Sequence, residues 1–220
     1  TTDADVQVSS TWINSMSSAA GSTSGSALIG PVKITPHANS IFSGVEQLDY
    51  AALMGWSAST AIDGNAAMGS AANFAIKVSD YPSEDQIKSK VASGDDVFAI
   101  HSLVSSGKKV FWVHDLKACV KAGSAGSIKN WIRQRVRWGA KAKHYSNPKA
   151  VKTSFWIATI GLIQLTTLGL LIADFKSTIL AFGVLWLGRA AIDIIFTKKV
   201  AAWFQISTPT LSWLLLAITY

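Results

Sequence analysis

Two short acidic motifs contain the residue types that can do chemistry. Asp3 and Asp5 alternate across one residue near the start of the chain. In a turn after a strand, their carboxylates can converge on a hard divalent cation that also binds a diphosphate. Asp95 and Asp96 follow Gly94 and precede an apolar run. One of them can act as a general base, or both can simply stabilise a helix start by facing the positive end of its dipole.

A third motif combines a primary amide, a guanidinium and an indole. Gln134, Arg137 and Trp138 stand at i, i+3 and i+4, so on a helix they lie together. A planar guanidinium holds phosphate oxygens with two hydrogen bonds, and an indole ring stacks on the face of a sugar. The alternative is an interfacial helix whose Trp and Arg lie among lipid headgroups.

The helix that carries this motif is expected to have two unlike faces. At about 100° per residue, one face collects Ile128, Trp131, Ile132, Val136 and Gly139, and the other collects Asn130, Gln134, Arg137, Trp138 and Lys141. We therefore expect Trp138 to point away from Trp131 and toward a ligand.

Apolar runs near the C-terminus predict membrane helices. Residues 154–173 are twenty residues without a charge, which is enough to cross roughly 30 Å of hydrocarbon. A second run, 177–196, contains Arg189 and Asp193, which can pair with each other at i, i+4. A third run, 208–220, is too short to span, and we interpret it as an incomplete helix.

Composition and charge agree with a membrane protein. The mean hydropathy is +0.29 and 49% of the residues are hydrophobic, which is high for a soluble domain. Residues 116–173 contain ten Lys or Arg and no acid, whereas residues 1–115 contain eleven acids and six bases. A basic region beside the membrane indicates an anionic lipid surface, not nucleic acid. By the positive-inside rule, residues 1–150 are expected on the cytoplasmic side of the inner membrane.

Hydrophobic periodicity predicts alternating strands and helices before the membrane segments. We expect strands at 2–6, 27–34, 71–78 and 109–113, helices at 12–16, 43–54 and 96–105, and a mobile connection at 17–26. This order predicts an α/β layer structure. Cys119 is expected in a buried strand, and the histidines, which lack zinc-ligand spacing, are interpreted as loop or surface residues.

The order of the motifs resembles that of the membrane-bound family 2 glycosyltransferases. An Asp-x-Asp is followed by Leu28–Val32, by Met68–Ile76, by Ser93–Asp96, and then by Gln-x-x-Arg-Trp and membrane helices. The resemblance covers nearly the whole chain. It is strongest to the branch of cellulose, hyaluronan and chitin synthases, and especially to bacterial members with Gly-Asp-Asp where others have Thr-Glu-Asp. It implies a GT-A (Rossmann-like) catalytic domain that inverts the anomeric centre.

The resemblance also implies roles for the acids. Asp3 would contact a nucleotide sugar, expected to be a UDP-sugar, and Asp5 would bind Mg²⁺ or Mn²⁺ on its pyrophosphate. Asp96 would be the general base, and Asp95 stands where the family has Glu. The acceptor would be a polysaccharide or a lipid.

Further residues follow from the same resemblance. Gly69, Ser70 and Asn73 would line the donor and acceptor pocket, and Gln134, Arg137 and Trp138 would hold the diphosphate and stack on the acceptor sugar. The expected organisation is a C-terminal part of a GT-A domain at 1–126, an interfacial helix at 127–150 and membrane helices at 151–220. Because the chain opens at Thr1 without an initiator Met, we expect a nucleotide-binding half upstream, and residues 1–220 alone to be inactive. The alternative function is a catalytically inactive, membrane-tethered scaffold or binding protein of that family.

Overall fold

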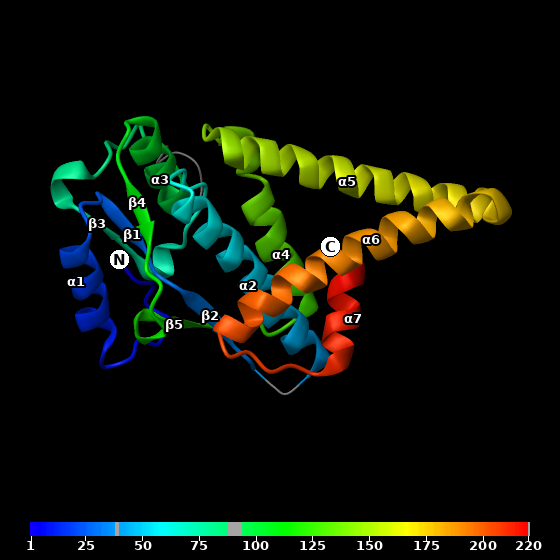
Figure 1. Cartoon of the computed structure of the whole chain (residues 1–220), viewed down its shortest axis with the longest axis horizontal. Coiled ribbons are helices and arrows are strands. Elements are labelled where there is room, and N and C mark those ends of the chain that lie inside the picture. The colour runs from blue at the N-terminus through cyan, green and yellow to red at the C-terminus, as the bar shows by residue number, and fades with distance from the viewer. Residues whose placement is uncertain (38–39, 88–93, 220) are drawn as a thin grey trace.

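The computed structural model describes residues 1–37, 40–87 and 94–219 and has a mixed α/β part from which two long helices project as a hairpin (Figure 1). The predicted α/β class is therefore confirmed at this coarse level. Ser93, the first residue of the Ser93–Asp96 motif, and Tyr220, in the third apolar run, lie outside the described residues.

Within the described residues, five short strands form two small sheets. In the first, β1 (Ala27–Ile29) lies between β3 (Phe74–Ile76), to which it is antiparallel, and β4 (Val110–Trp112), to which it is parallel. In the second, β2 (Val32–Thr35) runs parallel to β5 (Val120–Gly123).

The strand predicted at 27–34 is instead two strands, β1 and β2, which belong to different sheets. Pro31 has no N–H to continue a ladder, and a side chain at Gly30 would lie 2.3 Å from the Asn73 amide nitrogen. The chain changes sheet at these two residues. The predicted strand at 2–6 does not form either: the segment is a turn, and only Gln7 makes an isolated bridge, to Lys121.

The helices described in the α/β part are α1 (Trp12–Ser22), α2 (Ile41–Ile62), α3 (Asp95–Ser105) and α4 (Ile128–Gly139). Short 3-10 turns occupy Ala71–Asn73, Val78–Asp80, Leu116–Ala118 and Ala142–His144. Helix α1 extends through residues 17–22, which were expected to be a mobile connection. Met16, half-buried Trp12 and Ala19 pack against the sheet there, so tertiary packing stabilises the helix.

Among the described residues, two helices are long and apolar enough to cross a membrane: α5 (Pro148–Ala173) and α6 (Phe175–Trp203). Only 11% of the apolar window of α5 and 0% of that of α6 is buried in this structure. The predicted pairing of Arg189 with Asp193 is confirmed at 3.3 Å.

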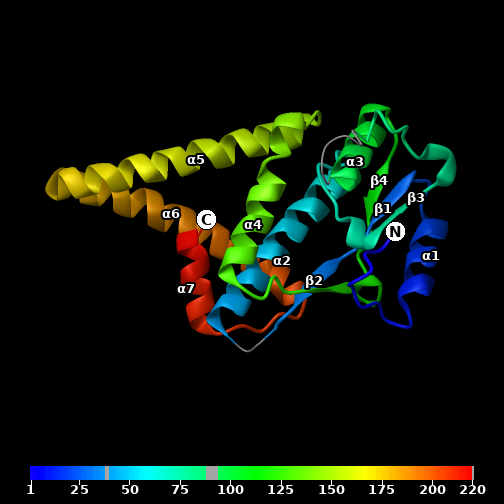
Figure 2. The same cartoon turned by 180° about the vertical axis from the view of Figure 1, so that it is seen from behind.

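Helix α6 continues beyond the predicted end of its apolar run at residue 196. Its last turns pack on α2, where a side chain at Gly55 would lie 2.5 Å from a methyl of Val200. The last helix, α7 (Thr210–Thr219), packs on α2 and α6, and both contacts can be followed from behind (Figure 2). Close approach is again at a glycine, Gly44, beside Ser212.

Two predictions about single residues were wrong. His101 is only 2% exposed in α3, and its Nε2 lies 2.9 Å from the carbonyl oxygen of Ala67. Cys119 is half-buried and precedes β5, so it is not a strand residue.

Candidate functional site

Asp96 lies at the start of α3, in contact with the loop that precedes β3. Its Oδ2 accepts a hydrogen bond from the Ala71 amide at 2.9 Å, and its Oδ1 accepts one from the Val97 amide at 2.8 Å. Burial raises the pKa of Asp96, whereas these two amides and the Lys141 ammonium lower it. A carboxylate has about four acceptor positions, so each oxygen keeps one for a further partner.

Lys141 covers the residue that caps this helix. Gly94 has φ +108°, which is strained for any residue with a side chain, and a Cβ there would lie 2.7 Å from Cδ of Lys141. Asp95, the next residue, is exposed, unlike half-buried Asp96. The glycine is thus required both by the backbone conformation and by the lysine packed on it.

Asp3, one of the two N-terminal acids, lies close enough to Asp5 and to Asp95 on α3 to be affected by their charges. Thr1 exchanges backbone hydrogen bonds with Phe74, which brings the following residues beside the loop at 69–73. Burial raises the pKa of Asp3, and the negative charges of Asp5 and Asp95 raise it further. Electrostatic repulsion between acids that are distant in sequence favours a nearby cation.

A complete metal site is not formed by protein side chains alone. Among residues 1–37, 40–87 and 94–219, no group of three or more His, Cys, Asp or Glu side chains is arranged to hold a metal ion. Asp3 and Asp5 can supply only part of a coordination shell. This donor set suits Mg²⁺, which is often held by one or two carboxylates together with substrate phosphates and water.

Tyr50, on α2, contacts residues of two predicted motifs, Ser70 in the loop at 69–73 and Trp138 on α4. Its hydroxyl donates to Ser70 Oγ at 3.4 Å, and its ring centroid lies 6.1 Å from that of Trp138. Burial raises the pKa of Tyr50 to about 12, with smaller contributions from the charges of Asp96 and Asp3. The phenol therefore stays neutral and can act as a hydrogen-bond donor at physiological pH.

Gly69 and Asn73, which were predicted to line the pocket together with Ser70, have packing roles in this structure. A side chain at Gly69 would lie 2.7 Å from Ile100, so the loop packs directly on α3. Asn73 is 0% exposed, and its amide nitrogen donates to the carbonyls of Pro31 and Ala118 at 2.8 and 2.7 Å. Its amide oxygen accepts from Trp12 Nε1 at 3.0 Å. Asn73 thus joins the two sheets and α1 instead of facing the site.

Buried acids on α2 hold α4 in place. Asp49, 1% exposed, pairs with Arg135 and accepts a hydrogen bond from Trp131 Nε1 at 3.2 Å. Burial raises the pKa of Asp49, which the hydrogen bond from Trp131 lowers in part. Burial lowers the pKa of Arg135, and the negative charge of Glu46 offsets part of that shift. One turn earlier, Glu46 accepts hydrogen bonds from Ser124 and Ala125, at 2.5 and 2.6 Å, in the loop that leads to α4.

The predicted faces of α4 were wrong. The Arg135 guanidinium lies 4.6 Å from the Trp138 ring and 5.7 Å from the Trp131 ring, so both indoles lie on the α2 side. Seven residues make nearly two full turns, which returns Trp138 to the azimuth of Trp131. Ile128, Ile132 and Val136 are instead 58%, 49% and 66% exposed.

Gln134, Arg137 and Trp138 have different environments on this helix. Gln134 and Trp138 are half-buried, and Trp138 packs against the core cluster that contains Tyr50 and Val120. Arg137 is exposed, and its charge lowers the pKa of Lys141. The arrangement leaves Arg137 available to an anionic ligand.

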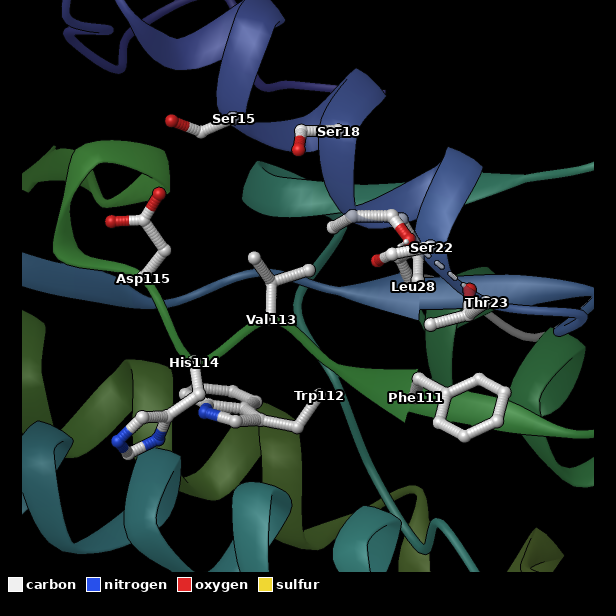
Figure 3. Close-up of a pocket in the computed structure, with 11 residues that line it drawn as sticks. Ser15, Ser18, Ser22, Thr23, Leu28, Phe111, Trp112, Val113, His114 and Asp115 are labelled. Atoms are coloured by element: carbon white, nitrogen blue, oxygen red, sulfur yellow. Dashed lines mark hydrogen bonds between the residues drawn. The ribbon is translucent and has the colours of Figure 1, made fainter.

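A surface cavity of about 280 Å³ lies elsewhere, between α1 and the end of β4. Ser15 and Ser18 line one side of it, and Val113 and Asp115 line the other (Figure 3). Within the described residues, its lining includes none of the predicted site residues.

Tyr50 is a site residue that sequence reasoning missed, and Lys141 was assigned to the predicted face of Arg137 and Trp138 without a role of its own. A tyrosine one position after Asp49, in an apolar helix that also contains Glu46, was a usable indication, because buried polar groups need partners. Lys141 follows Arg137 and Trp138 by four and three residues, a spacing that places it on their face of the predicted helix.

No protein-family model matches this chain, and a search of curated proteins finds no significant match.

Proposed function

We propose that this protein is an inverting glycosyltransferase of the GT-A type that transfers a sugar from a nucleotide-sugar donor to a polysaccharide or lipid acceptor at a membrane surface. The observation that carries the proposal is the convergence on Tyr50. This side chain is hydrogen-bonded to Ser70 and packs near Trp138, and the charges of Asp96 and Asp3 raise its pKa. Motifs separated by up to 135 positions in sequence, from Asp3 to Trp138, thus surround one buried phenol.

Asp96 is the proposed general base. The acceptor hydroxyl gives its proton to an Asp96 oxygen while the acceptor oxygen bonds to the anomeric carbon. The bond from that carbon to the diphosphate breaks, and the nucleoside diphosphate leaves with the electron pair. The amides of Ala71 and Val97 fix the orientation of the carboxylate and favour its ionised form, which is the form that accepts a proton.

The leaving diphosphate requires positive charge. Asp5, assisted by Asp3, is proposed to hold Mg²⁺ or Mn²⁺, which when bound would neutralise the diphosphate oxygens. Arg137 is exposed and can hold phosphate oxygens through two parallel hydrogen bonds. Trp138 and Gln134 would contact the sugar on the α4 side of the site.

The membrane location is proposed from α5 and α6. Both helices expose apolar side chains along their length, including Phe155, Leu165, Leu180 and Leu187 at 64%, 69%, 77% and 73%. Such surfaces are unfavourable in water and suit a lipid environment. The α/β part is proposed to lie on the cytoplasmic side of the inner membrane, because the basic residues cluster where it meets the hairpin.

Binding and turnover together test the proposal. In full-length protein in lipid nanodiscs, we expect Mn²⁺-dependent binding of a UDP-sugar by calorimetry and release of UDP when acceptor is added. Asp5→Asn should abolish the metal-dependent binding, because it removes a charged oxygen ligand. Asp63→Asn, an exposed acid paired with Lys149, is the matched control and should bind normally.

The outcomes separate the two candidate functions. Binding without sugar transfer for a broad panel of donors would favour a membrane-tethered binding protein. Unchanged Mn²⁺-dependent binding in Asp5→Asn would show that Asp5 is only a turn residue, and the proposed metal role would be dropped.

A further inference from the structure

Lys141 is buried to a degree that is unusual for a lysine. Its side chain is 7% exposed, although it follows the exposed end of α4. Its stem lies over Gly94, and Nζ would be 3.4 Å from a Cβ built on that glycine. Since Gly94 is the N-cap of α3, the ammonium is held at the N-terminal end of this helix.

An ammonium in this position needs negative partners. The N-terminal end of a helix is the positive end of its dipole, so it repels a cation. Burial lowers the pKa of Lys141, and the Arg137 charge lowers it further, whereas Asp96 and then Asp95 favour the charged form. The acids in the first turn of α3 therefore help to stabilise the charged form of this lysine.

We infer that Lys141 is a positioning residue for Asp96: its ammonium, held against Gly94, keeps the Asp96 carboxylate ionised and oriented toward the acceptor. This inference rests on the proposed function in one respect, the role of Asp96 as the base. The contact of Lys141 with the start of α3 does not depend on that role.

Several other groups act on Asp96 from the elements around it. Asp95, its neighbour on α3, disfavours the ionised form, whereas the amides of Ala71 and Val97 favour it. Tyr50 on α2 and Tyr145, after α4, are phenols whose pKa values are raised partly by the Asp96 charge. Neither phenol is positively charged, so the cationic contribution comes from Lys141.

A direct role for Lys141 in binding donor phosphate is the competing interpretation. The low exposure of Lys141 and its packing on Gly94 favour an electrostatic effect on Asp96, and exposed Arg137 is better placed to reach a diphosphate. The two interpretations predict different changes when the lysine is replaced.

A titration that needs no enzyme activity tests the inference. In full-length protein labelled with ¹³C at the aspartate carboxyl, the Asp96 resonance is identified by its loss in Asp96→Asn. In Lys141→Met, the Asp96 carboxyl should titrate at higher pH than in wild type, because removal of a nearby cation disfavours the carboxylate. Lys143→Met, which removes an exposed lysine two residues away, should leave the titration unchanged. An unchanged Asp96 titration in Lys141→Met overturns the inference.

The pH dependence of transfer gives a second readout. The acid limb of kcat/KM should move to higher pH in Lys141→Met, while the donor KM stays near the wild-type value, and Lys141→Arg should restore part of the wild-type profile. A raised donor KM with an unmoved acid limb would assign Lys141 to phosphate binding instead. If full-length wild type transfers no sugar, the proposed function fails, but the carboxyl titration still tests the contact.

Discussion

Adjacent residues Asp95 and Asp96 occupy different environments, so single substitutions can separate their roles. Asp96→Asn should cut turnover by about 10²-fold or more with donor affinity nearly intact, because general-base catalysis contributes on the order of 10²–10⁴-fold. Asp95→Asn should be milder, since Asp95 is exposed and only Asp96 accepts the Ala71 amide. Steady-state kinetics and donor-binding calorimetry on both variants check this. A larger turnover loss in Asp95→Asn would reverse the assignment.

Asn73 shows how a residue can match a motif and still have a packing role. Asn73→Ala should destabilise the fold by roughly 3 kcal/mol, because it leaves the carbonyls of Pro31 and Ala118 and the indole N–H of Trp12 without their partner. Ser70→Ala, which loses one hydrogen bond of 3.4 Å, is the control and should cost far less. Chemical denaturation measures both. A stable Asn73→Ala variant with a raised donor KM would instead support direct substrate binding.

At the scale of elements, the long periodic segments were the most predictable. Helix α3 begins and ends within one residue of the prediction, and both predicted membrane runs lie inside α5 and α6. Long apolar segments and capping residues are local features, so sequence alone is sufficient for them. Their extensions were missed because tertiary packing determines them, as where Val200 packs on Gly55 beyond the end of the apolar run.

Strands and helix faces were harder to predict for the same physical reason. Each strand has only three or four residues, and its partner is 45 to 88 positions away, from Ile29 with Phe74 to Val32 with Val120. The orientation of α4 depends on buried Asp49, which lies more than 80 positions upstream of Arg135. The residues of α4 and its neighbours in sequence do not indicate that Asp49 is the partner of Arg135. The acids and the Gln-x-x-Arg-Trp motif could be singled out from sequence, but the roles of Tyr50 and Asp49 required the fold.

The attachment of α4 to α2 is itself testable. Asp49→Ala should destabilise the protein by about 3–5 kcal/mol, because it leaves the largely buried Arg135 without its ion partner. Asp63→Ala removes an exposed partner of Lys149 and should cost at most about 1 kcal/mol. Chemical denaturation of the α/β part provides the comparison. Equal losses in the two variants would mean that the Asp49 pair does not hold α4.

Alanine substitution is expected to have opposite effects on stability at Gly55, where α2 contacts α6, and at Gly21 on α1. Gly55→Ala should destabilise by about 1–3 kcal/mol, because the added methyl would lie 2.5 Å from Val200 and 3.0 Å from Phe196. Gly21→Ala, in an exposed part of α1 with no atom within 4 Å of its Cβ position, should be neutral or stabilising by roughly 0.5 kcal/mol. Thermal unfolding would distinguish them, and a harmless Gly55→Ala would contradict the close packing.

On the scale of the whole molecule, the hairpin is anchored to the α/β part at both of its ends. Asn147 caps α5 and also donates to Asn65 and Ala66, which fixes the start of the hairpin. At the other end, Trp203 Nε1 donates to His114 Nε2 at 3.1 Å, and the two rings lie 4.9 Å apart. The turn between α5 and α6 therefore lies at the far tip of the hairpin, away from the α/β part (Figure 1).

This geometry gives a prediction of membrane topology. If α5 and α6 both cross the bilayer, the turn at Asp174 must lie on the opposite side from the α/β part. The basic residues beside the start of α5, together with Lys198 and Lys199 near the end of α6, then place the α/β part on the cytoplasmic side. In a Cys119→Ser background, which removes the one thiol of residues 1–220, Lys176→Cys should react with an impermeant maleimide applied outside intact cells. Lys143→Cys should react only after the cells are permeabilised. Labelling of Lys143→Cys in intact cells, with Lys176→Cys protected, would reverse the topology, and labelling of both would mean that the hairpin does not cross the membrane.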